Sequence, residues 1–202
     1  MPTWVRWIWL TLALLAGLWL LAGLLDWPAL VTACAVLTLP VALAATGYTG
    51  LLFAQGLARD LWQGPHATID LIAQAAAEGS AALLIAALFA GADPWVLRAL
   101  GWTLAGATTL HLLILVSENL LAPSPTMHHE LAVRAIREGA YSRLFWAGAL
   151  GLGGVAPLLL FGAALASGFS MFALIPMAVV ALAGSLAWEY IWVEAGQCVP
   201  IS

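Results

Sequence analysis

Residues Leu39–Ala90 read LPVALAATGYTGLLFAQGLARDLWQGPHATIDLIAQAAAEGSAALLIAALFA and contain two long apolar runs. A short polar break between Arg59 and His66 separates them. Each run is long enough to cross the hydrocarbon core of a bilayer, which takes about 20 residues of helix. The stretch therefore predicts two membrane-spanning helices joined by a short loop, and the rest of the chain continues this pattern.

The composition indicates an integral membrane protein. Of the 202 residues, 64% are hydrophobic and only 8% are charged, whereas a soluble domain is about half apolar and about a quarter charged. We therefore expect an all-α integral membrane protein with a single transmembrane domain, residues 1–202. The small net charge of -4 argues against a nucleic-acid partner.

The apolar runs predict a bundle of about six transmembrane helices. The first run is too long for the apolar region of a signal peptide, so we interpret it as a retained span. The predicted spans are roughly Val5–Leu25, Ala29–Leu57, Ala67–Ala90, Trp95–Leu121, Leu144–Leu165 and Phe169–Val193. Small residues at helical spacing, Gly101 with Ala105 and Gly162 with Ala166, predict close helix packing, as does the glycine-rich run 151–154.

The arginines orient the predicted bundle. With both termini in the cytoplasm, all arginines except Arg98 fall on the cytoplasmic side, as the positive-inside rule requires. The only sizeable loop, Ala122–Arg143, is then cytoplasmic. Thr126 is a candidate N-cap for a short amphipathic helix with Leu131 and Ile136 on its apolar side, and we expect this helix to lie on the membrane surface.

Most polar side chains inside the predicted spans fall on the third and fourth. Asp70, Gln74 and Glu78 are spaced four apart on one helix face, and His111 and Glu118 share a face of the next span. We predict a polar track that ends deep in the membrane at Glu78 and His111. It would carry protons or line a site for a polar-headed ligand, or else fix helix packing, and simple solvation fits Asp70 and Glu118 equally well.

The remaining polar groups suggest no catalytic centre. Glu189, Glu194 and Gln197 form a second polar group near the C-terminus, for partner docking or as ordinary solvated ends. The histidines do not provide two haem ligands at matched depth, and no metal-ligand spacing or nucleophile motif occurs in the sequence. We expect no haem or metal bound by this chain and no catalytic residues.

Four short motifs together resemble a known family. They are YTGLL at 48–52, EGSAA at 78–82, LFW at 144–146 and AGQ at 195–197. In this order and spacing, from Leu39 to the end of the chain, they resemble the C-terminal half of the NrfD/PsrC-type membrane subunits of polysulfide and nitrite reductases.

The resemblance implies a membrane anchor of a respiratory oxidoreductase in the bacterial cytoplasmic membrane. Such a subunit is not itself catalytic. It binds a ferredoxin-like [4Fe-4S] subunit, which contacts a catalytic subunit, often a molybdopterin enzyme. Electrons pass between that iron–sulfur subunit and menaquinone or ubiquinone, an exchangeable ligand, and some members are proposed to translocate protons.

A quinone headgroup needs hydrogen-bond donors at both carbonyls and a proton acceptor nearby. We expect His111 and Glu78 near the headgroup, with Tyr48 and Gln55 as hydrogen-bond partners. Typical members have eight or more spans and this chain shows no counterpart of their N-terminal bundle, so another membrane subunit is a further expected partner. The alternatives are a small proton or ion transporter that uses Glu78 and His111, or a purely structural anchor.

Overall fold

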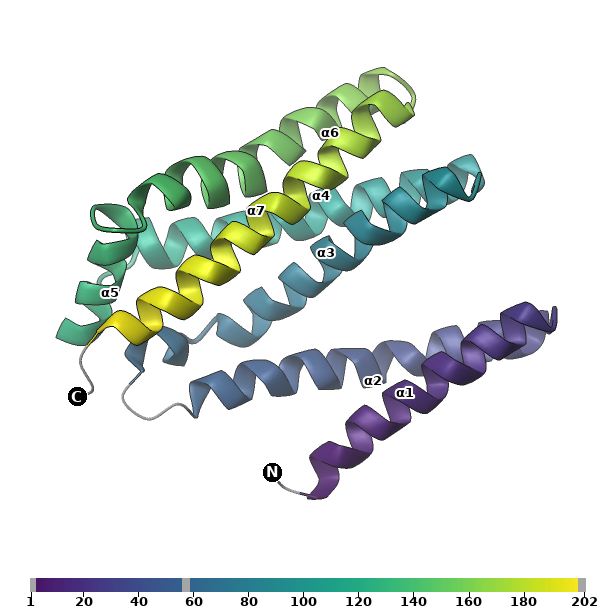
Figure 1. Ribbon diagram of the computed structural model, residues 1–202, viewed down its shortest axis with the longest axis horizontal. Coiled ribbons are helices and arrows are strands. Elements are labelled where there is room, and N and C mark those ends of the chain that lie inside the picture. The colour runs from purple at the N-terminus through teal and green to yellow at the C-terminus, as the bar shows by residue number, and fades with distance from the viewer. Residues whose placement is uncertain (1–2, 56–58, 200–202) are drawn as a thin grey trace.

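The computed structural model describes residues 3–55 and 59–199, and within these ranges it is helical and contains no strand (Figure 1). Six helical segments are long and apolar enough to cross a membrane, which confirms the predicted all-α membrane bundle. They are α1 (Thr3–Leu24), α2 (Pro28–Ala54), α3 (Ala67–Phe89), α4 (Pro94–Val116) with η2 (Ser117–Leu121), η3 (Leu144–Val155) with α6 (Ala156–Ala166), and α7 (Met171–Cys198).

The observed boundaries differ from the predicted ones at two places. The last span begins at Met171, because Phe169 belongs to the preceding turn and has a left-handed backbone with φ 64°. The same span continues to Cys198 instead of ending at Val193. The predicted end of the second span, Leu57, lies outside the described residues.

The helices alternate in direction, so the start of α1 and the end of α7 lie at the same end of the bundle (Figure 1). Short turns join the helices at the opposite end, and proline at the first position of α2 and α4 suits their starts. The shared end also carries η1 (Asp60–Gln63) and α5 (Met127–Arg137). We call it the α5 end.

Small apolar residues bring α3, α4, α6 and α7 together. The main core contains Ala77, Ala81, Ala105, Ala164 and Ala178, with larger residues such as Leu84 and Met177 filling the remaining space. The hairpin of α1 and α2 lies beside this core and contacts it through the packing of α2 on α3 (Figure 1). Small residues permit such close helix contacts in membranes, where burial of apolar surface does not drive helix association.

The closest approach is between η3 and α7. A Cβ added at Gly184 of α7 would collide with the backbone of Gly153, so neither helix tolerates a side chain there. This confirms the packing role predicted for the glycine-rich run. The prediction for Gly162 is wrong, because a Cβ at this glycine would meet nothing within 4 Å.

The amphipathic helix α5 forms where the loop sequence predicts it. Thr126 caps its start by accepting a 3.1 Å hydrogen bond from the backbone N–H of His129. Its buried face consists of Ala132, Val133 and Ile136, whereas Leu131 is exposed. A hydrogen bond from the Thr126 hydroxyl to Asp60 ties the helix to η1.

The contact between η3 and α7 predicts a sharp difference between two alanine substitutions. Gly184→Ala forces the backbones apart, and overpacking of this kind costs about 3 kcal/mol. For a chain of this size that corresponds to a fall in Tm of roughly 6–12 °C, measurable by thermal unfolding in detergent. Gly162→Ala is the matched control and should leave Tm unchanged or slightly raised. Equal effects of the two substitutions would contradict the proposed packing.

Candidate functional site

Three buried polar side chains form a hydrogen-bonded triad. His111 Nδ1 of α4 lies 2.6 Å from Asp70 Oδ1 of α3. The other carboxylate oxygen, Oδ2, accepts a 2.8 Å hydrogen bond from Gln74 Nε2, one turn along α3. All three residues are buried. Each carboxyl oxygen of Asp70 thus has a hydrogen-bond partner, one on α4 and one on its own helix.

This pairing differs from the predicted track, which placed His111 level with Glu78. The prediction measured depth from the α5 end of each helix, but α4 continues there as η2, beyond the level at which α3 begins. Counted from the tight turn at the other end, His111 is level with the segment between Asp70 and Gln74. Asp70 is consequently a buried partner of His111 and not a solvated residue near the interface.

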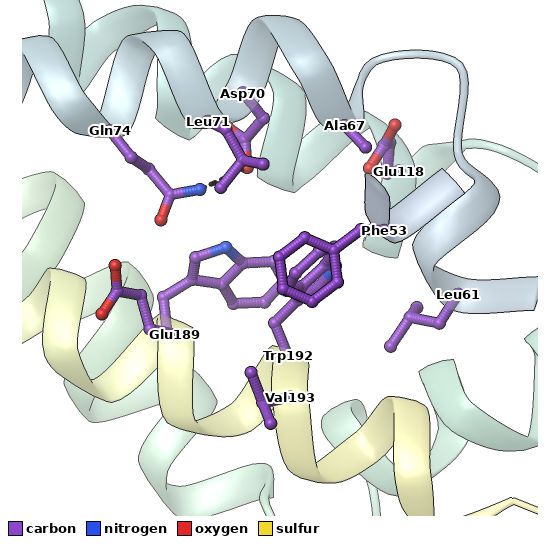
Figure 2. Close-up of a pocket in the computed structure, with 11 residues that line it drawn as sticks. Phe53, Leu61, Ala67, Asp70, Leu71, Gln74, Glu118, Glu189, Trp192 and Val193 are labelled. Carbon is purple, nitrogen blue, oxygen red and sulfur yellow. Dashed lines mark hydrogen bonds between the residues drawn. The ribbon is translucent and has the colours of Figure 1, made fainter. Parts of the chain in front are cut away.

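The triad borders a cavity of about 220 Å³, which we call the inner cavity (Figure 2). It is lined by Phe53, Leu61, Ala67, Asp70, Leu71, Gln74, Glu118, Trp188, Glu189, Trp192 and Val193. Figure 2 shows Gln74 and Glu189 facing one another at one end of the cavity, with Glu118 at the other. The residues come from α2, η1, α3, η2 and α7, so the cavity lies where the α1–α2 hairpin meets the four-helix core.

An unpaired acceptor faces this cavity. Gln74 Oε1 is buried and has no hydrogen-bond partner among the described residues, and it points into the cavity in Figure 2. The hydrogen bond to Asp70 requires the amide NH2 on the Asp70 side, so the oxygen is the atom left for the cavity. A buried acceptor without a partner is costly, and a ligand that donates a hydrogen bond would relieve that cost.

Aromatic rings close the cavity toward the α5 end. Phe53 of α2 packs edge-on against Trp192 of α7, with ring centroids 4.8 Å apart, and against Trp62 of η1 at 5.4 Å. Trp62 donates a 3.2 Å hydrogen bond to the Trp192 carbonyl. Arg59 in turn donates to the carbonyls of Gly196, Gln197 and Val199 at the end of α7. These contacts fix the wall by joining three distant parts of the chain.

A pair of carboxyl groups lies next to the triad. Glu78 of α3 lies beside Glu189 and Ser185 of α7, and Glu78 Oε1 has no hydrogen-bond partner among the described residues. A further cavity of about 240 Å³ lies between the α1–α2 hairpin and the core, and we call it the lateral cavity. Its lining includes Glu78, Gln74 and Glu189. Glu189 thus faces both cavities instead of joining Glu194 and Gln197 in one polar group.

The other predicted site residues lie apart from the triad. Tyr48 is buried in α2 and does not line the inner cavity. Gln55 is exposed at the C-terminal end of α2 and also lies outside the inner-cavity lining. Glu194 is partly exposed and Gln197 exposed at the α5 end of α7, where a docking partner would reach them.

Sequence reasoning missed the aromatic lining and one polar contact. Trp188 and Trp192 are spaced four apart on α7, a signal for a shared face, but tryptophans near span ends are typical of membrane interfaces. His66 lies at the end of the polar break between the second and third spans, and its Nδ1 lies 3.1 Å from Glu118 Oε1. Within residues 3–55 and 59–199, no cluster of three or more His, Cys, Asp or Glu side chains is arranged to hold a metal.

Comparison with known proteins gives one match. A family model described as polysulphide reductase, NrfD matches residues 1–201. The match therefore begins well before Leu39, the first residue of the region in which the sequence motifs show the resemblance. No curated protein and no solved structure matches the chain.

The Asp70–His111 pair predicts strong coupling between two substitutions. Asp70→Leu or His111→Leu alone leaves a buried polar group without its partner and should cost about 3 kcal/mol. The double variant removes both groups and should cost less than the sum of the single effects, by about 1–3 kcal/mol. Thermal unfolding of the four proteins in detergent measures this coupling, and additive effects would rule out the pairing.

Proposed function

The chain belongs to the polysulphide reductase NrfD family of membrane subunits, and we propose that it anchors a redox complex and binds quinol in the inner cavity. The family supports the anchor role, and six apolar helices make the chain a multi-pass membrane protein. The quinol site, the partner subunits and the location in a bacterial cytoplasmic membrane are parts of the proposal.

The observation that carries the quinol assignment is the unpaired Gln74 Oε1 in an aromatic-walled cavity. A hydroquinone hydroxyl donates a hydrogen bond and fits this acceptor, whereas a quinone carbonyl can only accept. His111 and Asp70 act as positioning residues, because their hydrogen bonds determine which amide atom of Gln74 faces the ligand.

The size of the inner cavity suits one ring. Its volume of about 220 Å³ is below the roughly 300 Å³ at the lower end of pockets for drug-sized ligands. Phe53, Trp188 and Trp192 offer ring faces and edges to an aromatic headgroup. The inner and lateral cavities adjoin, because they share the lining residues Leu71, Gln74 and Glu189. An isoprenoid tail would therefore extend from the inner cavity into the lateral cavity.

The chemistry divides between this chain and its partners. Oxidation of a quinol releases two electrons and two protons, and the inner cavity offers carboxylates and an amide next to which the protons would be released. We assign the electrons to a ferredoxin-like [4Fe-4S] subunit and, beyond it, a molybdopterin-type catalytic subunit. Glu194 and Gln197 at the α5 end are candidates for docking, and the arginine distribution favours a cytoplasmic location for that end.

The anchor role predicts which proteins copurify. A tagged chain extracted in mild detergent should retain an iron–sulfur subunit and a large molybdenum-containing subunit, identified by protein mass spectrometry and metal analysis. A further multi-span subunit would show that the membrane part is shared. A chain that purifies alone and without metal would contradict the anchor role and favour a small transporter that uses Glu78 and His111.

The quinol site predicts a selective effect of Gln74→Leu. Loss of one hydrogen bond to a buried ligand costs about 1.5 kcal/mol, so a short-tailed quinol should bind roughly tenfold more weakly. Quenching of tryptophan fluorescence in the purified complex reports binding, because Trp188 and Trp192 line the cavity.

The control is Thr103→Leu, which changes an exposed side chain of α4 whose hydroxyl bonds only its own helix. It should leave the quinol affinity unchanged. In the unsubstituted protein, the oxidised analogue should bind more weakly than the quinol. Equal quinol affinity of Gln74→Leu and the unsubstituted protein would show that the ring does not bind at Gln74.

A further inference from the structure

Glu118 borders two cavities at once. It lines one end of the inner cavity (Figure 2) and also a larger cavity of about 450 Å³ between η1, η2 and α5, which we call the outer cavity. We propose that Glu118 and His66 form the proton exit of the quinol site and release protons from the inner cavity to the α5 end. This inference rests on the proposed quinol site and assigns the path of its protons.

The geometry of the pair is that of a relay. Glu118 Oε1 lies 3.1 Å from His66 Nδ1, within direct hydrogen-bond reach. The Glu118 side chain is 28% exposed and the His66 side chain 50%, so the pair leads from an enclosed site to one that water reaches. His66 itself lines the outer cavity.

Local backbone structure places Glu118 at this junction. It lies in η2, a π-helical segment that continues α4 and is followed by the extended backbone of Ala122. π-Helical segments occur frequently at functional sites. Opposite it, a Cβ on Gly64 would approach within 3.3 Å of Glu118 Oε1, so glycine at this position leaves room for the carboxylate.

The proton transfer balances without a further reactant. An O–H bond of the quinol breaks as its electrons leave to the redox partner, and an O–H bond forms on the Glu118 carboxylate. Glu118 passes the proton to His66 Nδ1 and returns to its charged form. His66 then carries a proton on each ring nitrogen, and rotation of its half-exposed ring lets the Nδ1 proton leave to water in the outer cavity. This release restores the starting tautomer, which has its proton on Nε2.

The other titratable groups around the pair are already engaged. Asp70 of α3 accepts hydrogen bonds from His111 and Gln74, and Asp60 of η1 accepts one from Thr126. His129 of α5 also lines the outer cavity, and burial lowers its pKa, against a smaller opposing effect of Asp60. This direction favours the neutral imidazole of His129, which also hydrogen-bonds Ser124 through Nδ1.

The test uses the complete complex in membranes and compares quinol oxidation with quinol binding. His66→Ala and Glu118→Gln should each slow oxidation by about 10²-fold or more, the range for loss of a proton-transfer group. The quinol affinity of His66→Ala should stay within about twofold of that of the unsubstituted complex, because His66 does not line the inner cavity. Added imidazole should restore turnover in His66→Ala but not in Glu118→Gln. The matched control is His128→Ala, a histidine of α5 that lines neither cavity.

The outcomes separate this inference from the proposed function. Normal oxidation rates in both variants, with quinol still bound and oxidised, would overturn the proton exit and leave the quinol site standing. Slower turnover that imidazole does not restore, together with a lowered Tm of His66→Ala, would make the pair structural and also overturn it. A complex in which the unsubstituted protein binds no quinol would instead refute the proposed function.

Discussion

The 2.6 Å contact between His111 and Asp70 determines how the two central helices meet. In an apolar surrounding a carboxylate is costly unless other groups of the protein satisfy it. Asp70 obtains one hydrogen bond from α4 and one from its own helix, which locks α3 and α4 in a single register. The orientation of Gln74, and with it the polarity of the inner cavity, follows from that register.

The distribution of small and large residues explains why the cavity lies where it does. Toward the tight-turn end, alanines and glycines bring α3, α4, α6 and α7 into close contact and leave little space. Toward the α5 end, the cavity is lined by the bulky rings of Phe53, Trp188 and Trp192, and Phe53 of α2 packs against Trp192 of α7. Rings of this size do not fill space as densely as alanine faces do, and the polar groups of α3 and η2 border the remaining volume.

The sequence predicts the six spans and α5 well, because the length of an apolar run and an N-cap such as Thr126 are local properties. It does not predict the partner of His111, since helix register depends on how far α4 continues as η2. Residues distant in sequence form the inner cavity, and nothing local brings Phe53 beside Trp192. The docking role of Glu189 stays a prediction, and its place beside both cavities is a further feature that the sequence does not predict. Its orientation toward α3 depends on how α7 packs, which its neighbours in sequence do not specify.

The triad also determines which kind of ligand the inner cavity prefers. Asp70 accepts a hydrogen bond from the amide NH2 of Gln74, which leaves the amide oxygen facing the cavity. A ligand group that donates a hydrogen bond can pair with this oxygen, whereas a group that can only accept, such as a carbonyl, cannot. A single hydrogen-bonded pair at the base of the cavity therefore favours a donor over an acceptor of the same shape, without any movement of the helices.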